Sequence, residues 1–197
     1  MTERTIRKLV DLLLKNKLIS QAEYENYVYV LLGDAESLIV LVSILILAFF
    51  LKKEMPTMLF LISFFCLRNR TGGYHLDSFC KCYWGTMAIY ILVSIIACMA
   101  SECTEIVLGS AAISTVIILL FGSINHPNIH MDNDELKESK AMSRVIVIIE
   151  FCVLLFLSWI GNAKIYVTYL CLAIVLCAIL LIVSKVSGQE VRMNEDD

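Results

Sequence analysis

One short polar segment, with apolar sequence on both sides, carries a histidine and two cysteines that could act together. The histidine is His75, and the cysteines are Cys80 and Cys82. A thiolate can attack a peptide carbonyl when a nearby imidazole removes its proton, so a Cys–His pair is the minimum for thiol acyl transfer. Gly72 and Gly73 precede the histidine and let the chain turn sharply, because glycine accepts positive φ angles. This segment is therefore the candidate catalytic site.

The residues themselves leave two candidates for the nucleophile, Cys80 and Cys82. If Asp77 or Ser78 caps the helix that follows, both cysteines lie in its first turns. The positive end of the helix dipole there favours a thiolate. His75 cannot pair with Cys82 along one straight helix, because seven residues rise about 10 Å. The loop after the two glycines must therefore fold back toward the helix, or His75 must reach its partner in another way.

A metal site is the other interpretation of the same histidine and cysteines. Structural zinc usually has four ligands, with its cysteines two to four residues apart. His126 and His130 could complete a set with Cys80 and Cys82, but the spacing fits such a site poorly. We therefore expect neither a metal nor a cofactor, and we interpret His126 and His130 as solvated residues.

The composition indicates a membrane protein. The 197 residues are 59% hydrophobic and only 18% charged, with a mean hydropathy of +0.78. Soluble domains have about 45–50% apolar and about 25% charged residues. The apolar residues form long runs, which predicts an all-α integral membrane protein. The net charge of −3 is uninformative about nucleic acid, and no basic block predicts binding to it. The charged residues 1–17 predict no cleavable signal peptide.

Six apolar segments are candidate membrane spans. The first two, 37–51 and 57–67, are shorter than the ~20 residues that a crossing helix needs, so they are either tilted spans or a re-entrant hairpin. The other four are clear spans: 84–100, 106–124, 145–160 and 165–186. The mixed-charge stretch 132–144, between the spans 106–124 and 145–160, is expected to be a helical cytosolic loop.

The N-terminal region is predicted to be amphipathic helix, which lies at the membrane surface or packs on the protein's own cytosolic loops. Ser20 and Glu23 form a capping box that starts a second helix there. Apolar residues recur at helical spacing before it: Ile6, Leu9, Val10 and Leu13. We predict a single membrane domain, residues 1–197, in three parts: interfacial 1–36, transmembrane 37–186 and a cytosolic tail, 187–197.

The basic residues predict the orientation. With six spans and both termini inside, thirteen Lys and Arg residues lie on the cytosolic side. Only three then lie outside, Lys52, Lys53 and Lys164. This is the positive-inside bias of membrane proteins. The segment that carries His75 and Cys82 is therefore expected to face the cytosol, where free thiols persist.

The sequence R-T-G-G-Y-H at residues 70–75, with Cys82 seven positions after its histidine, resembles the signature of the accessory gene regulator B (AgrB) family. The similarity extends over most of the chain in length, amphipathic N-terminus and pattern of apolar runs. The family's histidine and cysteine are seven residues apart, so the resemblance selects Cys82 rather than Cys80 as the nucleophile.

AgrB proteins are membrane-embedded cysteine endopeptidases that process the propeptide of a cyclic pheromone in quorum sensing. The resemblance implies that Cys82, with His75 as its base, cleaves the C-terminal tail of this propeptide through a thioester. A cysteine or serine of the substrate then closes a thiolactone or lactone ring. It also implies a homodimer in the cell membrane of a Gram-positive bacterium.

Two arginines and the two glycines are candidates for positioning the substrate: Arg68, Arg70, Gly72 and Gly73. For the arginines two roles remain open, enforcing the membrane topology or holding acidic residues of the propeptide's tail.

The alternative from another class is a non-catalytic transporter or peptide-export subunit. Transporters carry broken-helix pairs and several intramembrane charges along a path, and neither pattern is evident in the sequence. Glu150 is an isolated carboxylate in an otherwise apolar predicted span. It either reaches up to the cytosolic surface or serves a function inside the membrane.

Overall fold

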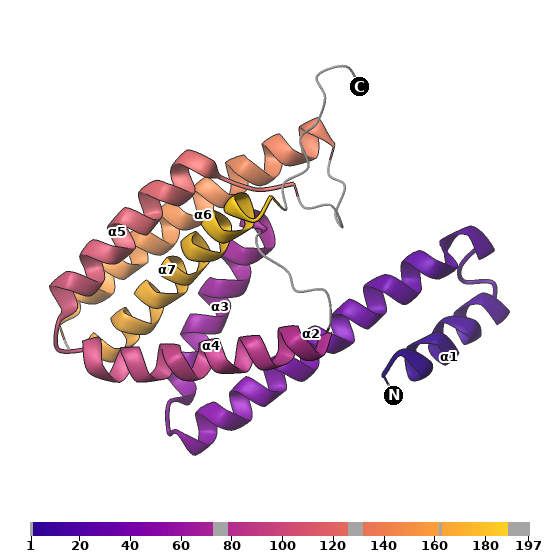
Figure 1. Ribbon diagram of the computed structural model, residues 1–197, viewed down its shortest axis with the longest axis horizontal. Coiled ribbons are helices and arrows are strands. Elements are labelled where there is room, and N and C mark those ends of the chain that lie inside the picture. The colour runs from indigo at the N-terminus through magenta and orange to yellow at the C-terminus, as the bar shows by residue number, and fades with distance from the viewer. Residues whose placement is uncertain (1, 73–78, 126–131, 162, 189–197) are drawn as a thin grey trace. The chain divides into compact units, whose positions relative to one another are not determined.

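A computed structural model of the chain describes residues 2–72, 79–125, 132–161 and 163–188, and Figure 1 shows how these parts fold. Over these ranges the chain forms helices and no strand, which confirms the predicted all-α class. The helices are α1 (Thr2–Lys15), the short 3-10 helix η1 (Gln21–Glu23), α2 (Tyr24–Phe50), α3 (Glu54–Thr71), α4 (Phe79–Ala100), α5 (Thr104–Phe121), α6 (Asn133–Ile160) and α7 (Lys164–Val186).

Among the described residues, five helical segments are long and apolar enough to cross a membrane: Gln21–Phe50, α4, α5, α6 and α7. Helix α3 has 18 residues, which corresponds to a length of about 27 Å. Its charged residues lie at its two ends, and its middle is apolar. The protein is therefore a multi-pass membrane protein, as predicted.

Two helices extend beyond the predicted apolar segments. The segment predicted at 37–51 belongs to α2, which has 27 residues, so this first span is not short. Asp34 and Glu36 interrupt the apolar run but not the helix, because backbone hydrogen bonds alone sustain a helix through polar positions. Likewise the stretch 132–144 continues into the next span as one helix of 28 residues, α6, which starts at a capping box of Asp132 and Glu135.

The first compact part of the chain comprises residues 1–47. The predicted capping box is confirmed: the side chain of Glu23 accepts hydrogen bonds from the backbone N–H of Ser20 at 2.8 Å and from its hydroxyl at 2.6 Å. Val10, Ile19 and Val28 form the buried cluster of this part. The amphipathic helix α1 thus packs its apolar face on the start of α2.

The second compact part, residues 48–197, is a helical bundle built around α7. Helix α7 contacts α3, α4, α5 and α6, and Figure 1 shows it running between α5 and α3. Most of its apolar length is buried, as expected for an apolar helix inside a bundle. Two apolar clusters lie along this axis, one around Leu67 and Ile174 and the other around Leu154 and Cys171.

Candidate functional site

The sequence-predicted site residues occupy the end of α3 and the start of α4. Arg68 and Arg70 lie in the last turn of α3, and Gly72 follows it. Cys80 and Cys82 are the second and fourth residues of α4, so both lie at the start of this helix as expected. Gly73, His75 and the proposed helix caps Asp77 and Ser78 lie outside the described residues. The fold-back of His75 toward Cys82 therefore stays a prediction.

The two thiols have different surroundings. Cys80 is exposed, whereas Cys82 is half-buried. Burial lowers the pKa of the Arg68 guanidinium. A partly buried thiol at the N-terminus of a helix is the kind of environment in which cysteines are reactive.

The turn after α3 requires glycine. Gly72 has φ +65° and ψ −146°, a backbone region that only glycine adopts readily. A side chain here would also meet the carbonyl oxygen of Ile124, because a Cβ atom would lie 3.1 Å from it. The carbonyl of Gly72 accepts hydrogen bonds from the Arg68 guanidinium and, at 3.3 Å, from the Thr71 hydroxyl. Arg68 thus folds back over the turn that leads into the predicted catalytic segment.

The α5–α6 connection and α6 hold this turn from the other side. The backbone N–H of Ile124 donates to the carbonyl of Thr71 at 3.1 Å. The hydroxyl of Ser139 donates to the carbonyl of Arg70 at 2.8 Å. Sequence analysis did not find these partners. A backbone donor leaves no trace in a sequence, and Ser139 is one of several serines in a mixed-charge stretch.

Three basic side chains surround the C-terminal end of α5. The ammonium of Lys185 lies 4.5 Å from the centre of the Phe121 ring, and the Arg144 side chain donates to the carbonyl of Leu119 at 3.0 Å. Lys140 packs against Gly122, where a Cβ atom would come within 2.9 Å of its side chain. Cations are stabilising at this end of a helix, where carbonyl groups lack partners. This arrangement caps α5 beside the turn at Gly72.

The expectation that Glu150 reaches up to the cytosolic surface is wrong. Its side chain is buried and accepts a hydrogen bond of 2.8 Å from the hydroxyl of Ser63 on α3. Position 150 lies on the face of α6 that packs on α3, so its carboxylate points into the bundle. Intramembrane carboxylates usually face the protein interior in this way.

A metal site finds no support in the described part of the chain. There, no three His, Cys, Asp or Glu side chains gather as metal ligands would. His75, His126 and His130 lie outside the described residues, so their predicted roles stay untested.

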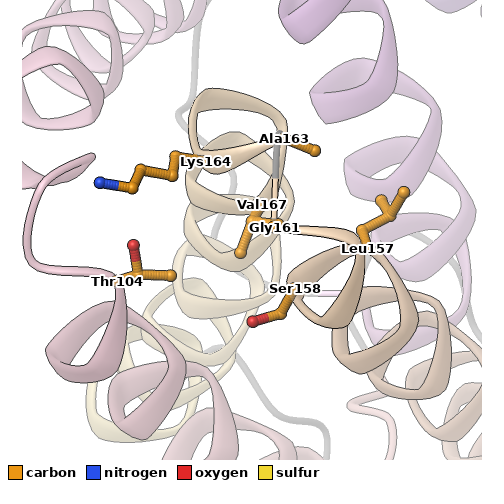
Figure 2. A pocket seen from close by; sticks show the side chains of 7 residues that line it. All are labelled: Thr104, Leu157, Ser158, Gly161, Ala163, Lys164 and Val167. Atoms are coloured by element: carbon orange, nitrogen blue, oxygen red, sulfur yellow. The ribbon is translucent and has the colours of Figure 1, made fainter.

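A small pocket lies at the other end of the bundle, where α5 and α7 begin and α6 ends (Figure 2). It is lined by Thr104, Leu157, Ser158, Gly161, Ala163, Lys164 and Val167. Its volume of about 20 Å³ has room for about one water molecule. Lys164 also forms an ion pair of 2.9 Å with Glu102 beside it. This pocket is too small to be a substrate site.

A comparison with protein families matches residues 6–182 to the family described as "Accessory gene regulator B". The matched range covers most of the chain and includes the end of α3, the start of α4 and the α5–α6 connection. Comparisons with curated proteins and with solved structures found no match.

Proposed function

The chain belongs to the accessory gene regulator B family, which processes quorum-sensing propeptides, and from this premise we propose that it is a membrane-embedded cysteine endopeptidase. Its substrate is the precursor of a peptide pheromone, from which it releases the C-terminal tail. The observation that carries the proposal is the position of Cys82: it is a half-buried free thiol at the start of α4.

Cys82 is the proposed nucleophile and His75 its general base. The imidazole takes the thiol proton, and the thiolate attacks a carbonyl carbon of the propeptide. The C–N bond then breaks, and the leaving amine takes the proton back from the imidazolium. The product is a thioester between Cys82 and the N-terminal part of the substrate. Backbone N–H groups at the start of α4 are the proposed donors to the oxyanion.

Ring closure is the proposed second step. A cysteine thiol or serine hydroxyl of the bound substrate loses its proton to His75 and attacks the thioester carbonyl. Cys82 leaves as a thiolate and recovers the proton, and the substrate becomes a thiolactone or lactone. Exchange of one thioester for another changes the free energy little, so the reaction needs protection from water more than a driving force. A site at the membrane interface provides such protection.

Arg68, Arg70, Gly72 and Gly73 are proposed to position the reacting groups and the substrate. The guanidinium of Arg68 is turned toward the carbonyl of Gly72, so its role is local. The side chain of Arg70 is exposed and is available to an acidic substrate tail.

The decisive experiment is cleavage of the cognate propeptide by membranes that contain the wild type, Cys82→Ala, Cys80→Ala or His75→Ala. Gel electrophoresis reports cleavage, and mass spectrometry of the protein reports the acyl adduct. We expect both signals to disappear in Cys82→Ala and His75→Ala and to persist in Cys80→Ala. Loss in Cys80→Ala alone would make Cys80 the nucleophile. Undiminished cleavage by all three variants would favour the export-subunit alternative.

We also propose that the site faces the cytosol and that the protein is a homodimer in the cell membrane. Two exposed cysteines allow a test of the orientation: Cys80 at the start of α4, and Cys103 in the turn after its end. A membrane-impermeant maleimide applied to intact cells should label Cys103 and should label Cys80 only after permeabilisation. The opposite pattern would reverse the topology. Cross-linking of two differently tagged copies tests the dimer.

A further inference from the structure

We propose that Ser139 on α6 is a positioning residue, which fixes the last turn of α3 and with it Gly72, after which the chain continues to His75. The inference rests on the proposed function, because it assigns Ser139 a role in the reaction of Cys82. The hydroxyl of Ser139 does not touch the reacting atoms. It acts through the backbone of α3, to which it donates a hydrogen bond at the carbonyl of Arg70.

The last turn of α3 depends on partners from outside the helix. An α-helix leaves its last four carbonyl groups without intrahelical donors. The carbonyl of Arg70 accepts from Ser139 at 2.8 Å, and the carbonyl of Thr71 accepts from the backbone of Ile124 at 3.1 Å. Ile124 lies in the α5–α6 connection, and Ser139 lies in the second turn of α6. The end of α3 is therefore attached to a different part of the chain at two successive residues.

This attachment is buried. Thr71 and Ile124 are inaccessible to solvent, and Ser139 is only 7% exposed. Water therefore has little access to replace a lost donor, and removal of the Ser139 hydroxyl leaves the Arg70 carbonyl poorly satisfied. The turn at Gly72 also has no spare room against Ile124. A shift of the last turn would move Gly72, and with it the Arg68 side chain that bonds to its carbonyl.

The hydrogen bond of Ser139 differs from the local bond that a helical serine usually makes. The hydroxyl of a serine in a helix commonly donates a hydrogen bond to a backbone carbonyl one turn earlier. Ser143, one turn after Ser139 on α6, does so: its hydroxyl donates to the carbonyl of Lys140 at 2.9 Å. Ser139 instead reaches a residue 69 positions away in the sequence. The two buried serines therefore form a natural comparison between an interhelical bond and a local one.

Loss of the interhelical bond should loosen the last turn of α3 without releasing the helix. Leu67, just before Arg68, is fully buried in the apolar cluster with Ile118, Val147 and Ile174. These contacts hold α3 in the bundle whether or not Ser139 has its hydroxyl. The expected defect therefore concerns the geometry of the last turn of α3 and of Gly72 rather than the presence of the fold.

The test compares Ser139→Val with Ser139→Thr, which have the same shape and differ by the hydroxyl. Ser143→Ala is the control for a buried serine with a local bond. Rates of propeptide cleavage are measured per amount of monodisperse protein. We expect Ser139→Val to lower kcat by about tenfold, the size of one hydrogen bond, with KM unchanged. Ser139→Thr and Ser143→Ala should stay within about twofold of the wild type.

A second readout does not need the substrate. Iodoacetamide reacts with the thiolate form of cysteine, and trypsin cuts after Lys81, so peptide mass spectrometry separates Cys80 from Cys82. Alkylation of Cys82 should be several-fold slower in Ser139→Val than in Ser139→Thr, while alkylation of Cys80 is equal in both.

The outcomes separate the two proposals. A wild type that does not cleave the propeptide contradicts the proposed function, and the alkylation rates still test the role of Ser139. If the wild type cleaves and Ser139→Val matches Ser139→Thr in kcat and in Cys82 alkylation, the positioning role of Ser139 is overturned. It is also overturned if Ser139→Thr is as slow as Ser139→Val, because the hydroxyl would then make no difference.

Discussion

The hydroxyl oxygens of Thr57 and Tyr90 lie 2.7 Å apart in the buried contact between α3 and α4. Both side chains are almost completely inaccessible to solvent. Tyr90 follows Cys82 by eight residues on α4, and Thr57 lies near the start of α3, the helix that leads to Gly72. The proposed nucleophile lies on α4, and the segment with its proposed base follows α3 in the sequence. This hydrogen bond thus joins the two helices that flank that segment.

Replacement of Tyr90 by Phe should weaken this joint. The variant loses one buried hydrogen bond, which contributes about 0.5–1.5 kcal/mol to the free energy of unfolding. We expect the melting temperature in detergent to fall by a few degrees and propeptide cleavage to slow. Tyr166→Phe is the control, because Tyr166 is partly exposed on α7. Equal melting temperatures for the two variants would show that the Thr57 contact adds nothing to stability.

The two arginines at the end of α3 should differ in importance. Arg68 bonds to the Gly72 carbonyl, whereas the side chain of Arg70 is exposed. We expect Arg68→Gln to reduce kcat for propeptide cleavage at least tenfold. Arg70→Gln should mainly raise KM, because the Arg70 side chain is proposed to bind the acidic tail of the substrate. The measurement is steady-state cleavage over a range of propeptide concentrations; a larger loss of kcat in Arg70→Gln would reverse this assignment.

The fold was largely predictable, because each predicted span of apolar residues overlaps a helix. What the sequence could not show is where helices continue through polar residues. Asp34 lies inside α2 and Lys137 inside α6, since a helix is sustained by its own backbone and not by the polarity of its side chains. Hydropathy therefore marks the part of a helix that lipid or the bundle covers, and it misses the rest.

The candidate site was predictable only in part. Residue types singled out Cys80 and Cys82, because thiols near a helix start have recognisable chemistry, and the resemblance to the AgrB family selected Cys82. The supports of the site depend on contacts between distant segments. Ser139 and Ile124 bond to backbone carbonyls of α3, so their partners have no side-chain identity that a sequence could reveal. The burial of Glu150 likewise depends on which face of α6 packs on α3. The sequence of each span taken by itself does not reveal that face.

Gly72 should tolerate no side chain. Alanine at this position would hold an unfavourable positive φ and bring its Cβ to 3.1 Å from the Ile124 carbonyl oxygen. We expect Gly72→Ala to lower the free energy of unfolding by about 1–3 kcal/mol and to abolish cleavage. Gly109→Ala is the matched control: it lies within α5 with nothing near its Cβ position, so alanine should stabilise by up to about 1 kcal/mol. Thermal unfolding in detergent measures both, and a Gly72→Ala protein as stable as the wild type would contradict the geometry.

The buried carboxylate of Glu150 should be replaceable by its neutral amide. Glutamine has the same shape and can accept the Ser63 hydrogen bond of 2.8 Å through its amide oxygen, while it avoids the cost of a buried charge. We expect Glu150→Gln to melt at or above the wild-type temperature and to cleave the propeptide at a similar rate. Glu150→Leu, which leaves Ser63 without this acceptor, should melt lower. A Glu150→Gln protein that is folded but inactive would instead show that the carboxyl group takes part in the reaction cycle.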